Sequence, residues 1–380
     1  MGQMGNSDKD LPREATELLE ERLAQSRGVP ELEELLRNLI RKKGRLTFAE
    51  FMQAALYHPQ YGYYSTPPLR IGAAGDYLTS PEVSSIFGWC LGRRLVRLSA
   101  EMHLPNELQI VEVGGGSGKL CRDVLTALLK ESRLHPNYLI VERNQHWAAV
   151  QKELLSSAGL ERFVSWAHDL NELPEKTIEG FIIANELIDS LPVHRVTVKC
   201  GKFLEIYVGL SGNEFTDQPG EPSTAELRRY LEESGITLPE GHQAEINLCA
   251  HDWLKLAASR LRAGAVLIID YGYTAQELFS GRFPEGTLLC YYKHTANTNP
   301  YKRVGMQDIT AHVDFSALAR WAPNFGLAPD TLIHQRDLLF SEGAAEMANS
   351  PVKKRELQEL TNPNGLGRLK LLTLRRRPNR

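Results

Sequence analysis

The sequence contains no apolar run that approaches the roughly 18 residues needed by a membrane-spanning helix. It also lacks an excess of charge of either sign, because 44 Lys and Arg are balanced by 47 Asp and Glu, for a net charge of −3. We therefore expect no membrane span and no general basic surface for nucleic acid. The content of 42% hydrophobic and 24% charged residues is typical of a globular protein and excludes collagen-like or disordered chains.

Cysteine is scarce and scattered, with no C-x-x-C pair: the five cysteines are Cys90, Cys121, Cys200, Cys249 and Cys290. Such an odd, dispersed set indicates reduced thiols rather than a disulfide framework, and each is expected to pack as a small hydrophobic residue. Residues 1–45 contain many glutamates and no apolar core of a secretory or transit peptide. These absences predict a cytoplasmic protein of the bacterial type.

The length of 380 residues exceeds the roughly 250–300 at which a single hydrophobic core stops growing. We therefore expect one enlarged domain or two domains. Leucines at helical spacing predict two helices within residues 12–41. A capping-box sequence begins another helix at Thr47. Ser80-Pro81 is expected to cap and open a further helix, which runs to about Ser99.

Beyond residue 105, apolar strands alternate with helices, which predicts a parallel sheet covered on both faces. The expected strands are residues 108–113, 138–141, 163–166, 180–184 and 265–270, with a final strand at 369–374. Residues 196–243 interrupt this alternation with a small meander whose turns fall at Gly201 and Gly212. The expected division is a helical N-terminal extension, residues 1–105, and a sheet domain, residues 106–380, that carries this segment as an inserted α/β subdomain.

A glycine-rich turn, Gly114-Gly115-Gly116-Ser117-Gly118, follows the first strand and lets backbone amides approach a ligand at a helix N-terminus. A Walker A loop is excluded because Val113 and Leu120 stand where it needs Gly and Ser or Thr. A dinucleotide fingerprint needs glycine where Lys119 stands. The spacing G-x-G-x-G, two residues after Glu112, resembles the first motif of class I S-adenosylmethionine methyltransferases. A tight turn without a ligand is the alternative.

Acidic residues follow the next two strands. Glu142 comes directly after the second strand, where a carboxylate can accept hydrogen bonds from both hydroxyls of a ribose; a surface glutamate is the alternative. Asp169 follows the third strand, where it either meets an adenine amino group or caps a turn.

The fourth strand leads into the sequence ANELIDSLP, residues 184–192, at the edge where reactive groups of an open α/β sheet are expected. Glu186 and Asp189 place two carboxylates three residues apart in this largely apolar segment. Carboxylates pair bidentately with a guanidinium and would hold a nitrogen in line with a sulfonium methyl. In the alternative interpretation, Asn185 or Asp189 caps a short helix.

These motifs together resemble a family of S-adenosylmethionine-dependent methyltransferases, which includes a mitochondrial complex I assembly factor acting as a protein arginine methyltransferase and many bacterial relatives. The resemblance spans residues 46–374. Besides the glycine turn and residues 184–193, it rests on FMQAALYHP (51–59), YGYY (61–64), GDYLTSPE (75–82), IDYG (269–272) and QDITAHVDF (307–315). Relatives often carry Pro and Arg in the glycine turn where this chain has Gly115 and Ser117, so this is a divergent member.

The resemblance implies a class I methyltransferase fold, which is Rossmann-like, with a helical N-terminal extension, an inserted subdomain and S-adenosyl-L-methionine as the cofactor. It implies a protein substrate with an arginine nitrogen as the candidate acceptor, and a respiratory-complex subunit as a candidate partner. It also implies that the N-terminal segment closes over the cofactor. The expected cofactor-binding residues are Gly75, Asp76, Thr79, Ser80, Pro81, Glu112, Gly114, Gly116, Gly118, Glu142, Asp169 and Asn185.

His312 lies between Asp308 and Asp314, a pattern that suggests a metal ligand or a general base. No second histidine has ligand spacing, so no metal is expected. Thr310 or Asp314 is expected to cap a helix over residues 314–321. The resemblance implies that His312 lines the substrate mouth and joins Glu186 and Asp189 as a candidate catalytic residue.

Three functions remain open at this stage. The first is a methyltransferase acting on a protein, with Glu186 and Asp189 orienting the acceptor; the others are a non-catalytic assembly factor on the same fold and a small-molecule methyltransferase. A nucleic-acid acceptor is disfavoured because no aromatic and basic stripe is visible. The acids at the strand ends predict a locally acidic cleft, and the sequence does not predict the oligomeric state.

Overall fold

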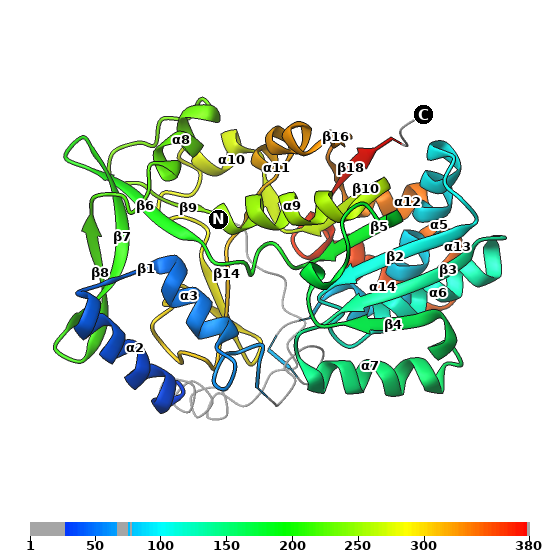
Figure 1. The fold of residues 1–380 in the computed structure, drawn as a ribbon, viewed down its shortest axis with the longest axis horizontal. Helices are drawn as coiled ribbons and strands as arrows, with labels where there is room; N and C mark the ends of the chain where they lie inside the picture. The colour runs from blue at the N-terminus through cyan, green and yellow to red at the C-terminus, as the bar shows by residue number, and fades with distance from the viewer. Residues whose placement is uncertain (1–26, 67–74, 77, 378–380) are drawn as a thin grey trace.

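Two sheets organise the computed structural model, which describes residues 27–66, 75–76 and 78–377; the larger sheet lies to the right in Figure 1 and the smaller to the left. The larger sheet has the strand order β16-β18-β10-β5-β2-β3-β4, with β17 paired to β18. Its parallel strands are β2 (Glu107–Val113), β3 (His135–Val141), β4 (Val164–Ala167), β5 (Ile178–Asn185) and β10 (Leu261–Asp270). The strand β18 (Lys370–Arg376) pairs antiparallel with β10, and the short strands β16 (Ala328–Pro329) and β17 (Ile333–His334) pair antiparallel with β18.

The predicted strands of this sheet are confirmed, most of them somewhat longer than expected. The prediction of a parallel sheet needs one correction, because β18 runs antiparallel to β10, with Asp270 opposite Lys370 and Gly264 opposite Arg376. An apolar strand that is buried on both faces has the same pattern in either direction, so the sequence did not reveal this reversal.

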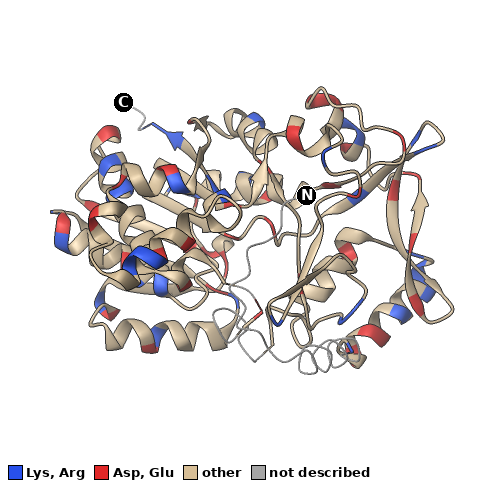
Figure 2. Ribbon diagram, turned by 180° about the vertical axis from the view of Figure 1, so that it is seen from behind, with Lys and Arg blue, Asp and Glu red and all other residues tan. Residues whose placement is uncertain are grey.

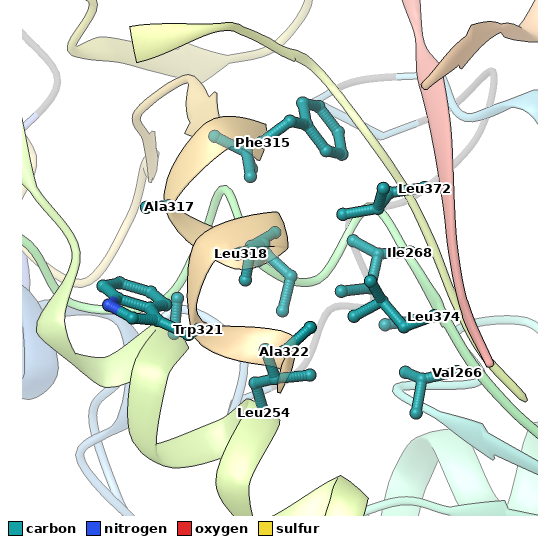
Figure 3. Packing of buried hydrophobic residues seen from close by; sticks show 14 of the residues in the cluster. Leu254, Val266, Ile268, Phe315, Ala317, Leu318, Trp321, Ala322, Leu372 and Leu374 are labelled. Atoms are coloured by element: carbon teal, nitrogen blue, oxygen red, sulfur yellow. The ribbon is translucent and has the colours of Figure 1, made fainter. Parts of the chain in front are cut away.

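Helices cover both faces of the larger sheet. On one face lie α9 (Leu248–Arg260) and α11 (Phe315–Trp321). Phe315 and Leu318 of α11 point toward Ile268 and Leu372 of the sheet (Figure 3). The other face packs on α5 (Ser85–Met102), α6 (Lys119–Glu131), α7 (Gln145–Ser157), α12 (Gln335–Ser341) and α14 (Pro351–Thr361). These two hydrophobic clusters, one on each face, hold the larger sheet in place, and the candidate site described below lies at the carboxyl ends of its parallel strands.

The helix expected from Ser80 to about Ser99 is divided in two, so that prediction is wrong in part. The short helix α4 (Ser80–Val83) begins after Thr79, and Ser80 is its first residue rather than its cap. The chain becomes extended at Ser84, with φ −160°, and the Ser84 hydroxyl accepts a hydrogen bond from the Ile86 amide at 3.2 Å. Serine side chains can form such local hydrogen bonds in place of the backbone bonds of a helix. As a result α4 ends before Ser84, and Ser84 is the N-cap of α5.

The smaller sheet combines the inserted segment with the N-terminal part of the chain. Its strands are β1 (Leu46–Thr47), β6 (His194–Lys199), β7 (Lys202–Ser211), β8 (Glu214–Gly220) and β9 (Gln243–Ile246), in the order β1-β7-β6-β9 with β8 on β7. Turns at Gly201 and Gly212, with φ +71° and +62°, agree with the predicted meander; β9 was not predicted. The helix α8 (Glu226–Glu233) lies between β8 and β9. Because β1 pairs with β7, the N-terminal part packs with the insertion.

The helices α2 (Pro30–Lys43) and α3 (Phe48–Tyr57) pack on this smaller sheet. The capping box at Thr47 is confirmed, because its side chain accepts from the Glu50 amide while the Glu50 carboxylate accepts from the Thr47 amide. The first of the two helices predicted within residues 12–41 falls largely outside the described residues, whereas the second is α2.

The chain after β10 builds small ladders over the sheet edge. The strand β11 (Gly272–Tyr273) pairs with β15 (Val313–Asp314). The strands β12 (Leu289–Tyr292), β13 (Thr295–Asn297) and β14 (Asp308–Thr310) form a separate three-stranded sheet. The Asp314 side chain caps α11 by accepting from the Ala317 amide at 3.1 Å, as predicted. These ladders bring residues 308–314 to the ends of the parallel strands.

All five cysteines are free thiols. Cys90, Cys121 and Cys290 are buried, in agreement with the expected packing role, whereas Cys200 is exposed at a turn and that expectation is wrong for it. Within the part of the chain that the structure describes, no helix has the length and apolar character needed to cross a bilayer.

Candidate active site

The glycine turn after β2 has the backbone geometry that only glycine adopts readily. Gly114, Gly116 and Gly118 have φ of +77°, +50° and +83°, a region where a side chain is strained. A Cβ atom on Gly115 would lie 2.7 Å from the Ile140 side chain. Gly118 immediately precedes α6. The turn therefore presents backbone at a helix N-terminus with no side chain at the glycine positions.

Gln151 of α7 holds this turn, although no sequence pattern singled it out. It is fully buried, and its amide nitrogen donates to the Gly116 carbonyl at 2.8 Å and to the Glu142 carboxylate at 3.2 Å. Its amide oxygen accepts from Trp166 at 2.9 Å. A lone glutamine on a largely polar helix carries no sequence signal of such a role.

Glu142 lies beside the glycine turn, directly after β3. Its carboxylate accepts from the Asn144 amide at 2.8 Å as well as from Gln151. Burial raises its pKa, and these two hydrogen bonds oppose the rise. The structure thus gives Glu142 a fixed, half-buried position at the carboxyl end of its strand, where a ribose would meet it.

Asp169 has the capping geometry that was one of its two interpretations. One carboxylate oxygen accepts from the backbone and side-chain nitrogens of Asn171, both at 2.8 Å, and the other pairs with Arg143. Although burial raises its pKa, the hydrogen bonds from Asn171 and Arg143 bring the pKa below its usual value. Both oxygens of Asp169 therefore already have partners in the protein.

Glu112 is buried inside β2 and accepts a hydrogen bond from the Tyr138 hydroxyl at 2.8 Å. Burial raises its pKa to about 8, with repulsion from Glu142 adding to the rise. Glu142, directly after the neighbouring strand β3, is thus close enough to Glu112 to act on its pKa.

Asn185 and Glu186 stand where β5 ends. Glu186 adopts φ +50°, which is uncommon for a residue with a side chain. Its carboxylate accepts from the Ser80 amide and the Asn185 side-chain nitrogen, each at 3.3 Å. The Asn185 side-chain oxygen is buried and has no hydrogen-bond partner among the described residues. Such an atom is costly unless a bound molecule donates to it.

The segment expected to close over the cofactor reaches this edge. Ser80 contacts Glu186 and also donates from its hydroxyl to Gln335 at 2.9 Å, while Thr79 and Pro81 beside it are buried. Asp76 is held from elsewhere: it accepts from the Tyr63 hydroxyl at 2.9 Å and from the Lys293 amide at 2.6 Å.

Gly75 is described next to Asp76, whereas Tyr77 of the same motif lies outside the described residues.

A cluster of buried carboxylates gathers at the ends of β5, β10 and β14. Asp270 accepts from the Ile188 and Asp189 amides at 2.9 and 3.2 Å. Burial raises the pKa of Asp270 and of Asp308 to about 7. Burial also raises the pKa of Glu186 to about 8 and that of Asp189 well above its ordinary range, with repulsion from Asp270 second in both cases. The segment after β5 forms turns rather than a short helix, so neither Asn185 nor Asp189 is a helix cap.

Tyrosines line the same cluster. The Tyr64 hydroxyl donates to Asp308 at 2.7 Å, and the Tyr57 hydroxyl lies 3.1 Å from both the carbonyl and the hydroxyl of Ser190. Burial raises the pKa of Tyr271 and of Tyr291, and repulsion from Asp189 and Glu186 adds to the rise in both. Sequence reasoning did not select these rings individually, although the YGYY motif, residues 61–64, was part of the resemblance. In Figure 2, several Asp and Glu residues, drawn in red, lie on loops between the two sheets.

His312 is adjacent to the carboxylate cluster in the chain but contacts other groups. The amide of the preceding residue, Ala311, donates to the Asp189 carbonyl at 2.9 Å. The imidazole itself packs on Tyr273 and Phe283, with ring centroids 5.3 and 5.9 Å apart. Burial, with Arg368 as the second influence, lowers its pKa to about 4. Among the described residues, no group of three or more His, Cys, Asp or Glu is arranged to hold a metal ion.

The residues present fit an adenosyl cofactor. The turn from Gly114 to Gly118 leaves backbone accessible at a helix N-terminus, and Glu142 stands one strand away. The orphaned Asn185 oxygen adds a buried acceptor at the end of β5. The same edge therefore holds a backbone cradle, a carboxylate for hydroxyl groups and an unsatisfied polar atom.

Comparison with known proteins defines the class. Residues 90–333 match the model of a family described as S-adenosyl-L-methionine-dependent methyltransferases. The chain therefore belongs to this family, has the class I methyltransferase fold and uses S-adenosyl-L-methionine as its cofactor.

Individual relatives come from animals and bacteria. Protein arginine methyltransferase NDUFAF7 of Bos taurus is 30% identical over 75% of this chain and 68% of its own length, and the Drosophila melanogaster homolog is 28% identical over 86% and 77%. A crystal structure of a Burkholderia thailandensis protein bound to S-adenosyl-homocysteine superposes with a TM-score of 0.85 at 28% identity, covering 93% of this chain and 96% of that one. The chain is thus similar to both arginine methyltransferases and a cofactor-binding bacterial protein.

Proposed function

We propose that this methyltransferase acts on a protein, with an arginine side-chain nitrogen as the acceptor. The observation that carries the proposal is the carboxylate cluster of Glu186, Asp189, Asp270 and Asp308. Among the residues that the structure describes, none of these four carboxyls forms an ion pair with a lysine or arginine, and burial is the first cause of the raised pKa of each. Buried acids without a cation are costly, so a cationic acceptor would relieve the cost. The likeness to relatives named as protein arginine methyltransferases supports arginine.

The cofactor residues follow from the same edge. The glycine turn would receive the nucleoside and amino-acid parts of the cofactor through backbone groups, Glu142 would accept from the ribose hydroxyls, and Asn185 would accept a hydrogen bond through its free oxygen. Gly75, Thr79 and Pro81 would cover this region. Asp169 would contribute by fixing Arg143 and its own turn, because both of its oxygens are engaged. When bound, S-adenosyl-L-methionine supplies an activated methyl group.

The acceptor residues would act by position and by charge. Glu186 and Asp189 would hold the guanidinium by paired hydrogen bonds, which orients one nitrogen and excludes water around it. A carboxylate with a raised pKa is a better proton acceptor than an ordinary one near neutral pH. The bound guanidinium would favour the ionised form of Asp189, which could then accept the proton that the nitrogen loses on methylation. Burial, with repulsion from Asp270 and Asp308 next, keeps the pKa of Asp189 high.

The test is incubation of the protein with isotopically labelled methyl donor and an extract of cells that lack it, followed by mass spectrometry of labelled species. Wild type should label methylarginine in protein. Asp189→Asn should reduce the label by about 10²–10⁴-fold, whereas Asp252→Asn, whose side chain is 82% exposed on α9, should match wild type. S-adenosylhomocysteine should bind all three proteins equally well by calorimetry.

The other functions give different results in the same experiment. Label only in the small-molecule fraction would reject a protein acceptor, and label on lysine would reject arginine. Absence of any label, combined with normal S-adenosylhomocysteine binding, would favour a non-catalytic assembly factor.

A further inference from the structure

A second charged cluster, of opposite sign, lies on the same edge of the larger sheet. Three cationic side chains surround the ring of Tyr273: the charged groups of Lys370, Arg282 and Arg368 lie 4.4, 4.8 and 5.9 Å from the ring centroid. Arg368 also donates to the Tyr273 hydroxyl. Lys370 is buried and donates to the Gly272 carbonyl at 2.7 Å. We refer to these three residues as the basic cluster.

The basic cluster has an excess of positive charge within the described structure. Glu277 is the acid beside it, with its carboxylate 4.0 Å from the Arg282 guanidinium. Burial lowers the pKa of Lys370, and repulsion from Arg282 and Arg368 lowers it further against the opposing effect of Glu277. Like charges held together in this way destabilise the fold unless an anion binds between them.

His312 gives an independent sign of a missing partner. Its ring packs on Tyr273, and its Nδ1 atom is buried without a hydrogen-bond partner among the described residues. The imidazole is neutral near pH 7 because its pKa lies at about 4. A neutral imidazole can donate from one nitrogen, so it could add a hydrogen bond to an anion without adding charge.

The basic cluster is a neighbour of the carboxylate cluster. Lys370 stands directly opposite Asp270 in the β10–β18 pair, and adjacent strands are about 4.8 Å apart. Tyr291 lies near both groups: burial raises its pKa, Asp189 and Asp308 raise the pKa further, and Arg368 opposes the rise. A bound chain that places a cation in the carboxylate cluster would therefore pass the basic cluster within a few residues, at roughly 3.3–3.6 Å per extended residue.

We propose that Arg282, Arg368 and Lys370 form an anion subsite that takes the carboxylate of an Asp or Glu located a few residues from the methylated arginine. This inference rests on the proposed function and adds a specificity determinant to it. Guanidinium groups match carboxylates bidentately. The carboxylate cluster alone would repel an acidic residue near the acceptor arginine. The cationic side chains of the basic cluster would instead attract that residue and so favour peptides that contain it.

The experiment measures binding of fluorescent peptide pools in the presence of S-adenosylhomocysteine. Each pool has a central arginine and random flanks, with one flanking position fixed as Asp or Glu, or as Asn or Gln in its matched pool, and the fixed position is moved from four residues before to four after the arginine. Wild type should bind the acidic pool about five- to tenfold more tightly than its amide pool at one position or two adjacent ones.

Two double variants are compared. Arg282→Gln with Arg368→Gln should bring the ratio of the two affinities close to one. The matched control, Arg162→Gln with Arg262→Gln, removes two charges elsewhere: Arg162 sits near the Phe163 ring and Arg262 pairs with Glu179 at 2.6 Å. It should keep the wild-type ratio. Thermal unfolding of all proteins checks that each is folded.

Equal binding of the acidic and amide pools by wild type, or binding of neither, would overturn the subsite. So would a preference that persists in the Arg282 and Arg368 variant. The proposed function fails separately: if the charge preference and its loss are observed but labelled methyl appears on no arginine, the subsite stands and the acceptor assignment does not. If arginine is labelled but the acidic and amide pools bind equally well, the acceptor assignment stands and the subsite does not.

Discussion

The two halves of the active-site edge are built by different physical means. The cofactor half, named for its proposed role, comprises the glycine turn with Glu142 and Gln151 and relies on backbone conformation and hydrogen bonds among neighbouring elements. The acceptor half, likewise named for its proposed role, comprises Glu186, Asp189, Asp270, Asp308 and Tyr64 and relies on buried carboxyl groups with raised pKa values.

The difference predicts that the halves fail in different ways. A backbone cradle depends on whether a Cβ atom can be accommodated and responds little to pH. A cluster of buried acids depends on protonation and on the partners of each carboxylate. A change in one half should therefore leave the defining property of the other intact, and the predictions below test this separation in order of decreasing effect.

Gly118→Ala should damage the cofactor half most. An alanine at this position would have to adopt φ +83°, which is strained for a residue with a side chain. Its Cβ atom would also lie 3.2 Å from the Gln151 side chain, so the turn must shift. We expect S-adenosylhomocysteine binding by calorimetry to weaken about 10- to 100-fold. The control is Gly159→Ala, which has φ +70° but nothing within 4 Å. That variant should lose stability alone, and equal losses of cofactor affinity in both would contradict a cradle role for Gly118.

The acceptor half should make stability fall as pH rises. Asp270 and Asp308 have folded-state pKa values of about 7 against an ordinary 3.8, so the folded state holds protons that the unfolded state has released. Their contribution is fully present below about pH 4 and is lost as pH rises through 7. Between pH 5 and 8 each of the two groups should lower the free energy of unfolding by about 2–3 kcal/mol, which urea denaturation would measure.

Asp308→Asn should flatten this pH dependence, whereas the exposed Asp252→Asn should not. A stability that rises between pH 5 and 8, or a slope unchanged by Asp308→Asn, would show that these carboxyls do not retain their protons in the folded protein.

Tyr64→Phe should weaken the acceptor half by removing the hydrogen bond to Asp308. We expect kcat/KM for the acceptor to fall about fivefold, with S-adenosylhomocysteine binding unchanged. Tyr230→Phe is the matched control, because its hydroxyl makes an equivalent buried bond to Asp314 at 2.9 Å outside both halves. A similar loss of kcat/KM in Tyr230→Phe would mean that the effect is general destabilisation.

Thr47→Ala should have the smallest effect on the site. Loss of the cap of α3 should cost about 1 kcal/mol in the free energy of unfolding. Because α3 ends at Tyr57, which contacts Ser190, the KM for the acceptor should rise about twofold or less. Ser350→Ala removes the side-chain cap of α14, which packs in the hydrophobic layer of the larger sheet rather than on α3, and should cost similar stability. An equal rise in KM in Ser350→Ala would show that the effect of Thr47→Ala does not act through α3.

The sequence predicted the features that depend on neighbouring residues. The glycine turn, the caps at Thr47 and Asp314 and the strands β2, β3, β4, β5, β10 and β18 follow from local pattern, whereas β16 and β17 were not predicted. The family resemblance added the fold and the cofactor. Whether each expected site residue has its expected role stays a prediction, although the structure brings Asn185, Glu186 and Ser80 together.

Features that depend on distant contacts could not be predicted in the same way. Gln151 looked like an ordinary surface residue, and only the fold shows that it joins Gly116, Glu142 and Trp166. The helix breaks at Ser84, whose hydroxyl accepts a hydrogen bond from the Ile86 amide, whereas the adjacent Ser85 is the first residue of α5. The sequence alone does not distinguish these two serines. His312 stood between two acids in the sequence, yet its ring turns toward Tyr273 and the basic cluster.

The hydrogen bond between Tyr64 and Asp308 can form only after the ribosome has made most of the chain. Its two residues are 244 positions apart, and the Ser80–Gln335 bond spans 255. A ribosome that adds roughly 5–20 residues per second needs tens of seconds to pass from the first partner to the second. The nascent chain therefore contains the glycine turn, residues 114–118, long before it contains Asp308 of the proposed acceptor half. Fragments that end before Asp308 should transfer no methyl group.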